Sequence, residues 1–253
     1  MNAVKVRNVE IGTGIPKICV PIVGETRSEI VGAAQEIAAI GADVVEWRVD
    51  WYDDCGQFPA VAETLRLLRD ILGDTPVLFT LRTAKEGGKK EITPEDYVKL
   101  NQDVIKSGYI DMVDAELFTG DAYVQSIIET AHNFGVIVVA SNHEFHRTPE
   151  KEELIKRLIK MQELGADIPK IAVMPQNKKD VLTLLAATEE MTGEHARGPI
   201  ITMSMTGTGV ISRLCGEVFG SSLTFGAVGK GSAPGQLGVK ELRTVLNLLH
   251  DSI

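Results

Sequence analysis

The stretch that decides the fold is IPKIAVMPQ, residues 168–176, an apolar run that carries one lysine. If this run forms a strand, its side chains alternate between two faces. Lys170 then shares a face with Ile168 and Ala172, while Ile171 lies on the other face. The pattern therefore places Lys170 on a buried face of a sheet.

A buried lysine has two interpretations. An ammonium in an apolar place is costly unless it is paired or loses its proton, and a neutral amine is a nucleophile toward carbonyls. That interpretation predicts a Schiff-base lysine at Lys170. The alternative is a lysine whose stem lies on apolar atoms while its charged head reaches solvent. The surrounding chain has to decide between them.

The rest of the chain repeats one unit, a strand followed by a helix. Strict alternation predicts parallel strands joined by helical crossovers, and eight units in 253 residues favour a (β/α)8 TIM barrel over an open doubly wound sheet. We expect one domain, residues 1–253, in which residues 4–16 form a β-hairpin that turns at Gly12 and Gly14. The strands are predicted at 17–24, 43–52, 76–83, 112–117, 136–145, 168–176, 199–207 and 221–229, and the helices at 26–41, 59–72, 94–108, 121–135, 149–165, 178–191, 209–220 and 239–252.

Composition excludes several classes of protein. The formal net charge of -9 and the lack of a basic stripe argue against binding to nucleic acid or to anionic membranes. Cys19, Cys55 and Cys215 are few and far apart, which suits a reducing compartment better than a disulfide framework or a zinc site. Neither a signal peptide nor an apolar run of about twenty residues is present. We therefore expect a cytoplasmic protein.

Charged side chains on the predicted strands point to a polar pocket. In residues 43–52, Glu46, Arg48 and Asp50 share one face, and Arg82 and Asp114 lie on the two following strands. Ions inside a barrel are expensive unless they pair or bind something. We assign Asp114 and Asp50 to a structural network near the barrel floor. Glu46, Arg48 and Arg82 lie nearer the carboxyl ends of their strands, where barrels carry their active sites.

His143 follows the fifth strand and is the histidine best placed for acid-base chemistry, because its unperturbed pKa is about 6.5. The alternatives are a core histidine, or a metal site with His146, whose spacing across a strand-to-loop transition argues against metal binding. Glu86 lies in a charged loop after the third strand. From the residues alone, a solvated loop carboxylate is the better interpretation of Glu86.

The last two loops are rich in glycine and precede helices. Arg213 lies in the first turns of the predicted helix 209–220, and Ser232 and Gln236 lie on a predicted lid. An arginine fork at a helix amino end suits a carboxylate, although a phosphate fits these loops as well. The alternative for Arg213 is an exposed surface ion pair.

These motifs, in this order, resemble the type I 3-dehydroquinate dehydratase family over essentially the whole chain. The resemblance rests on DVVEWRVDWY, AKEGGKK, SNHEFH, IPKIAVMPQ, PIITMSMTGTGVISRL and GSAPGQ. It implies a barrel whose floor is closed by the amino-terminal hairpin, a homodimer, and a shikimate-pathway enzyme without metal or organic cofactor. The sequence departs from some members of the family at Pro21, where they have serine, and at Gly207 and Gly229, where they have lysines.

The resemblance also implies a role for each candidate residue. Lys170 would form an imine with the ketone of 3-dehydroquinate, His143 would be the general acid and base, and Glu86 would position His143. The other residues would bind the substrate: Arg213, Ser232 and Gln236 its carboxylate, Glu46, Arg48 and Arg82 its hydroxyls, and Met203, Met205 and Phe225 as walls of the pocket. Two other functions stay open, a class I aldolase-like Schiff-base barrel and a catalytically silent barrel that binds a small acid.

Overall fold

The computed structural model describes residues 2–228 and 235–253. A two-stranded antiparallel hairpin, β1 (Val4–Val6) and β2 (Val9–Ile11), precedes one curled sheet of nine parallel strands in the order β11-β10-β3-β4-β5-β6-β7-β8-β9. The sheet strands are β3 (Lys17–Ile22), β4 (Val44–Arg48), β5 (Val77–Thr80), β6 (Met112–Glu116), β7 (Ile137–Glu144), β8 (Ile168–Val173), β9 (Ile201–Ser204), β10 (Leu223–Ala227) and β11 (Leu237–Gly238). The predicted alternation of parallel strands and helices is confirmed.

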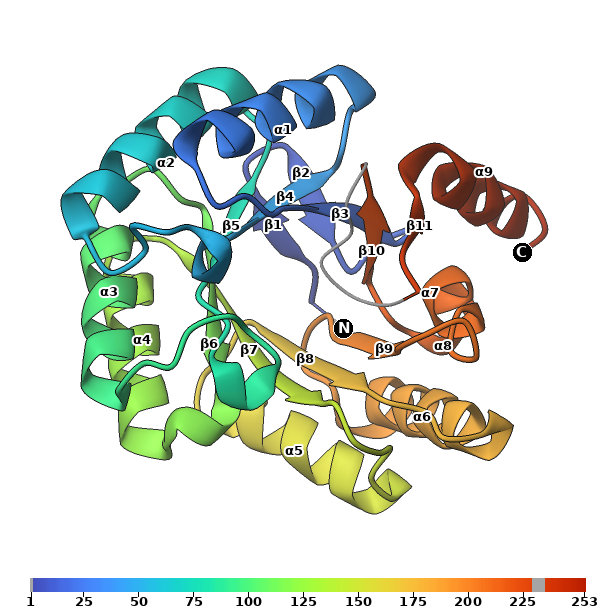
Figure 1. Ribbon diagram of the computed structural model, residues 1–253. Coiled ribbons are helices and arrows are strands. Elements are labelled where there is room, and N and C mark those ends of the chain that lie inside the picture. The colour runs from blue at the N-terminus through green and yellow to red at the C-terminus, as the bar shows by residue number, and fades with distance from the viewer. Residues whose placement is uncertain (1, 229–234) are drawn as a thin grey trace.

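The longer helices surround the strands on the outside of the curled sheet (Figure 1). They are α1 (Arg27–Ile40), α2 (Phe58–Leu72), α3 (Pro94–Lys106), α4 (Asp121–Asn133), α5 (Lys151–Glu163), α6 (Lys178–Glu190) and α9 (Val239–His250). Short helical turns follow three of the strands: η1 (Val49–Trp51), η2 (Ala84–Glu86) and η3 (Leu117–Thr119). A further turn, η4 (Met191–His195), continues directly from α6.

Local sequence fixes where the helices begin and end. Thr26 caps α1 in a reciprocal pair with Glu29, and Gly41 ends that helix in the left-handed region at φ 78°. Thr93 caps α3, whose first residue is Pro94. These capping residues lie in the local sequence, which is why it predicts where α1 and α3 begin.

The alternation of strand side chains separates two cores. Val45 and Trp47 of β4 pack outward against the helices, and Ile171 of β8 does the same beside α5 and α6. Ile168 and Ala172 point the other way, into the apolar cluster inside the curled sheet. The predicted faces of the Lys170 stretch are therefore confirmed.

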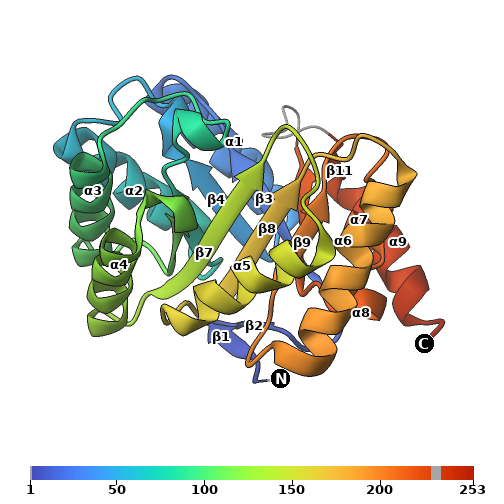
Figure 2. The ribbon, with the colours of Figure 1, turned by 90° about the horizontal axis from the view of Figure 1, so that it is seen from below.

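The hairpin differs from its prediction in the position of its turn. Its strands pair Val4 with Ile11 and Val6 with Val9, so the turn lies at Arg7 and Asn8 and not at the two predicted glycines. Arg7 adopts a left-handed φ of 52°, and its side chain is fixed by Asp111. Figure 2 shows the hairpin below the strands, at the end opposite to their carboxyl ends.

The predicted helix 209–220 is wrong as a single element. The structure has two short helices there, α7 (Ile211–Leu214) and α8 (Gly216–Phe219). Gly216 lies so close to the chain that a Cβ atom would come within 2.5 Å of the Ser221 carbonyl oxygen. This tertiary contact redirects the chain at a point where the periodicity of the sequence continues.

No helix in the described part of the chain is both long and apolar enough to cross a membrane.

Candidate active site

A small cavity of ≈ 80 Å³ lies at the carboxyl ends of the strands. It gathers side chains from β4, β7, β8, β9 and β10 and from the segment that follows β5, which are far apart in the sequence and are brought together by the sheet. The predicted site residues that line it are Glu46, Arg48, Arg82, Glu86, His143, Lys170, Met203, Met205, Arg213, Phe225 and Gln236. Ser232 lies outside the described residues. The structure thus brings all the described candidates together.

Lys170 is buried in this cavity, with 3% of its surface exposed. Its Nζ lies 3.5 Å from Asp114 Oδ2 and 3.9 Å from Glu46 Oε1. The ammonium also lies 4.7 Å from the centre of the Phe225 ring. The interpretation in which the head of Lys170 reaches solvent is therefore wrong.

His143 and Glu86 form a hydrogen-bonded pair next to this lysine. Glu86 Oε2 lies 3.0 Å from His143 Nδ1 and accepts the backbone N–H of His143 at 2.9 Å. Strand β7 pairs with β8 so that His143 is opposite Ala172, two residues beyond Lys170. Because Nδ1 faces Glu86, the opposite ring nitrogen, Nε2, is the one available for proton transfer.

Burial perturbs both members of the pair. It lowers the pKa of His143 well below 6.5, and the positive charges of Arg82, Lys170 and Arg48 lower it further. Burial and the neighbouring Glu116 raise the pKa of Glu86 to about 8. The neutral imidazole is consequently favoured around neutral pH, which is the form that can accept a proton.

Glu86 is not the solvated loop carboxylate that its local sequence suggests. It ends η2 and is 5% exposed, and its second oxygen, Oε1, accepts a hydrogen bond from Asn142 Nδ2 at 3.3 Å. The position beside His143 that the family resemblance implied is the position that the structure shows.

A network of buried ion pairs lies next to Lys170. Arg82 contacts Asp114 at 2.9 Å, Glu116 at 2.8 Å and Ser141 Oγ at 3.0 Å. Burial alone would raise the pKa of Asp114, but Arg82 and Lys170 outweigh it and hold that pKa below its ordinary value. Asp114 is therefore an anion in contact with Lys170.

The sequence assignment of Asp114 and Asp50 to one floor network was wrong in its location. Asp114 belongs to a mutually paired network, but this network contacts the cavity lysine. Asp50 lies in η1, beyond the end of β4, where its carboxylate holds Arg48 through two hydrogen bonds of 2.7 and 2.9 Å. Strand β4 ends at Arg48, before the predicted end at residue 52, so Asp50 lies beyond the strand.

Arg213 reaches the cavity from α7. It is 1% exposed, and its Nη1 lies 3.7 Å from the sulfur of Met203. Burial lowers the pKa of its guanidinium to about 10. The exposed surface pair considered for Arg213 is excluded by this burial.

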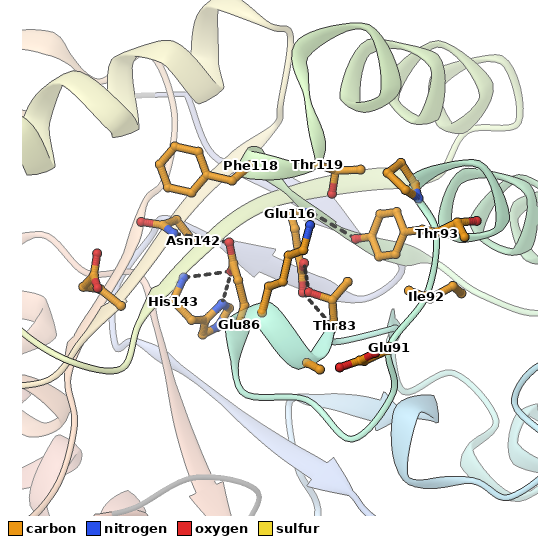
Figure 3. Close-up of a pocket in the computed structure, with 15 residues that line it drawn as sticks. Thr83, Glu86, Glu91, Ile92, Thr93, Glu116, Phe118, Thr119, Asn142 and His143 are labelled. Atoms are coloured by element: carbon orange, nitrogen blue, oxygen red, sulfur yellow. Dashed lines mark hydrogen bonds and ion pairs between the residues drawn. The ribbon is translucent and has the colours of Figure 1, made fainter.

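A larger pocket of about 780 Å³ lies on the other side of the His143–Glu86 pair (Figure 3). Residues 83–86 and 91–94 form one wall, and η3 and the end of β7 form another. Among residues 2–228 and 235–253, no group of three or more His, Cys, Asp or Glu side chains is placed to hold a metal ion.

Sequence reasoning missed several residues at the site. Phe145 lines the cavity, and Asn142 contacts Glu86. Both belong to the stretch SNHEF, inside the strand predicted at 136–145 and next to His143 in sequence, but no role was assigned to them. No sequence signal identifies Arg157 of α5, which reaches Asn142 from a helix.

Comparisons with known proteins give a consistent relationship. Residues 18–253 match the family model described as type I 3-dehydroquinase. The chain is 53% identical to the 3-dehydroquinate dehydratase of Clostridioides difficile (strain 630), with 99% of this chain and 98% of that protein covered. It is 56% identical to the enzyme of the same name from Listeria monocytogenes serotype 4a (strain HCC23), covering 99% of each chain.

Solved structures agree with these relationships. A crystal structure of type I 3-dehydroquinate dehydratase from Clostridium difficile with covalently modified comenic acid superposes with a TM-score of 0.97 at 53% identity, covering 100% of this chain and 99% of that one. The 3-dehydroquinate dehydratase of Geobacillus kaustophilus HTA426 gives a TM-score of 0.96 at 40% identity, with coverage of 99% and 97%. Sequence and structure together place this chain in the type I 3-dehydroquinase family.

Proposed function

We propose that this chain converts 3-dehydroquinate to 3-dehydroshikimate, as a hydro-lyase of the shikimate pathway, through an imine on Lys170. The observation that carries the proposal is the single cavity in which the buried Lys170 amine meets the His143–Glu86 pair. Relatives that bear the name 3-dehydroquinate dehydratase match over nearly their whole length, which supports the same substrate.

The first step joins the lysine to the substrate ketone. Nζ of Lys170 attacks the carbonyl carbon; two of the three protons of the lysine ammonium pass to the carbonyl oxygen, which leaves as water, and the third stays on the iminium nitrogen. Asp114 and Glu46, 3.5 and 3.9 Å from Nζ, are anionic neighbours that stabilise the positive charge on nitrogen before and after this step. The route requires no metal or organic cofactor.

The second step moves a proton and expels water. The iminium acidifies the adjacent carbon, because the electrons left by proton loss delocalise toward nitrogen. Nε2 of His143 takes that proton, and the resulting enamine expels the β-hydroxyl, to which His143 returns the proton to form water. Hydrolysis then releases the product and restores the lysine.

The remaining residues orient the substrate. We assign its carboxylate to Arg213, Ser232 and Gln236, and its hydroxyls to Glu46 and the guanidinium of Arg48. The family resemblance assigned Arg82 to the substrate hydroxyls. Its guanidinium donates hydrogen bonds to Asp114, Glu116 and Ser141. We therefore assign Arg82 the main role of holding the anions next to Lys170. Met203, Met205 and Phe225 form apolar walls that limit access of water.

We further infer that the curled sheet is a closed (β/α)8 barrel of one domain, with the hairpin covering its floor. Two hydrogen bonds join the starts of β9 and β10: the backbone N–H of Ser222 donates to the Ile200 carbonyl at 2.9 Å, and the backbone N–H of Thr202 donates to the side-chain hydroxyl of Ser221 at 3.0 Å. A homodimer and a cytoplasmic location stay predictions, which sedimentation velocity and cell fractionation check.

Borohydride trapping tests the function directly. The purified protein is mixed with 3-dehydroquinate, reduced with borohydride and analysed by intact and peptide mass spectrometry. We expect an adduct on the peptide that contains Lys170, together with the enone absorbance of 3-dehydroshikimate in the unreduced reaction.

Two outcomes would contradict the proposal. Folded protein that forms neither adduct nor product would indicate a silent barrel. Product without an adduct on Lys170 would retain the reaction and reject the imine. A Lys170→Met variant, which keeps the apolar stem, is the matched control because it cannot form the adduct.

A further inference from the structure

A chain of buried side chains connects helix α5 to His143. Arg157 Nη1 donates to Asn142 Oδ1 at 2.8 Å, and Asn142 Nδ2 donates to Glu86 Oε1 at 3.3 Å. Glu86 then meets His143 through its other oxygen. Arg157, Asn142 and Glu86 are 9%, 2% and 5% exposed, so these contacts are shielded from water. Figure 3 shows Asn142 beside Glu86 and His143 in the wall of the larger pocket.

The chemistry of the two end groups fixes the orientation of the Asn142 amide. A guanidinium has only donors, whereas a glutamate carboxyl accepts hydrogen bonds at either oxygen when it is ionised and at its carbonyl oxygen when it is protonated. With Oδ1 on Arg157 and Nδ2 on Glu86, both contacts are favourable. The flipped amide would turn its NH2 group toward the donors of the guanidinium, so the contact with Arg157 would be lost whether Glu86 is ionised or protonated. Arg157 therefore determines which way the asparagine points.

Arg157 is itself held on several sides. Its Nε donates to Glu153 Oε1 at 2.8 Å, Nη1 lies 3.5 Å from Glu144 Oε2, and the guanidinium lies 5.2 Å from the Phe118 ring centre. These contacts come from α5, the end of β7 and η3. The guanidinium of Arg157 is therefore held in a defined position, from which it donates a hydrogen bond to Asn142.

We propose that Arg157 and Asn142 are positioning residues for the reaction: they hold Glu86 so that its second oxygen keeps the His143 ring aimed into the lysine cavity. The expected loss of turnover rests on the proposed function, because it is measured with 3-dehydroquinate as the substrate. The effect of Arg157 and Asn142 on the His143–Glu86 pair is measurable without substrate. The competing explanation is that the two residues only fasten α5 to β7.

Other charged groups act on the His143–Glu86 pair in addition to Arg157 and Asn142. Arg82 lies 3.8 Å from Glu86 Oε2, Glu116 raises the pKa of Glu86, and Arg48 and Lys170 act on His143 together with Arg82. Glu144 faces Arg157. The hydrogen bond from Asn142 lowers the pKa of Glu86, opposing the effect of burial. Loss of that bond should therefore move proton uptake by the pair to higher pH.

The first experiment follows the His143 ring nitrogens by 15N NMR through a pH titration of the free protein. In Asn142→Leu and Arg157→Met, we expect the midpoint of the pair to rise relative to the wild type. Arg157→Lys keeps one donor for Asn142 Oδ1, so its midpoint should stay near that of the wild type. Lys160→Met is the matched control, because Lys160 lies on the same helix in an exposed pair with Asp121.

The second experiment measures steady-state rates with 3-dehydroquinate. We expect kcat of Asn142→Leu and Arg157→Met to fall by about tenfold to a hundredfold with little change in KM, because misplacement of a catalytic group affects the chemical step. In a Glu86→Ala background, Asn142→Leu should cost less than about twofold, since the residue acts through Glu86.

Two results would overturn the proposal. One is a folded Asn142→Leu protein with the midpoint and kcat of the wild type. The other is an equal loss of kcat in the presence and absence of Glu86, which would indicate that the asparagine only ties α5 to the sheet. Failure of the wild type to act on 3-dehydroquinate would reject the proposed function instead, and the NMR titration would still decide the positioning role. If Arg157→Met fails to fold, Arg157→Lys and Asn142→Leu carry the test.

Discussion

Replacing the carboxyl of Glu86 by an amide should change how the stability of the protein depends on pH. Burial, with Glu116, raises the pKa of Glu86 from 4.5 to about 8. Between these values the folded protein keeps a proton that the unfolded chain has lost. The folded state then binds more protons, so stability is lost as pH rises from the unfolded value toward the folded one.

The size of this effect follows from the shift. At about 1.4 kcal/mol per pKa unit, the whole shift corresponds to about 5 kcal/mol of lost stability. His143 has the opposite sign, because its lowered pKa removes stability as pH falls below about 6.5. The window from about pH 6.5 to 8 therefore isolates Glu86, and the wild type should lose about 2 kcal/mol across it relative to Glu86→Gln.

Urea unfolding at several pH values in this window measures the difference between the two proteins. The new amide faces the Nδ2 donor of Asn142, so Glu86→Gln carries a penalty that is the same at every pH. The change of the difference with pH is thus the diagnostic quantity. Glu63→Gln, on the exposed face of α2, is the control. A difference that stays flat from about pH 6.5 to 8 would mean that Glu86 is already ionised, and would refute the burial argument.

Three further variants test the roles of individual residues. Lys170→Ala should fold, shown by an unchanged circular dichroism spectrum, but lose both adduct and turnover; substantial residual activity would reject the imine mechanism. His143→Ala should still be trapped by borohydride while kcat falls by about a hundredfold to ten thousandfold, and an unchanged rate would remove its acid-base role. Asp114→Asn leaves Arg82 and Lys170 without their shared anion, so urea unfolding should show a loss of about 3–5 kcal/mol, and a loss below about 1 kcal/mol would contradict that ion network.

Much of the fold could be predicted because each strand and helix carries its own local pattern. The alternation around Lys170 gave its buried face, and Thr26 and Gly41 marked the ends of α1. The turn of the hairpin at Arg7 was not predicted, because a left-handed conformation is unusual for arginine and depends here on the distant Asp111.

The site residues could be predicted from the sequence where their position on a predicted strand marks them as functional. His143 follows from such a position and Lys170 from its place on a buried strand face, whereas Glu86 follows only from the family resemblance, since its own segment is as charged as a surface loop. Arg157 lies on a polar helix and looks like any solvent-facing arginine in the sequence. Its burial is a product of tertiary packing.

The hairpin also determines when folding can finish during synthesis. Val6 and Ile11 pack in one cluster with Ile168, Ile201 and Leu223, which belong to β8, β9 and β10. The ribosome makes the hairpin before any of these strands, so its apolar face has to wait for most of the chain to emerge. Contacts of such long sequence separation form slowly. Nascent chains that stop short of β10 should therefore expose this face and bind chaperones that recognise apolar segments.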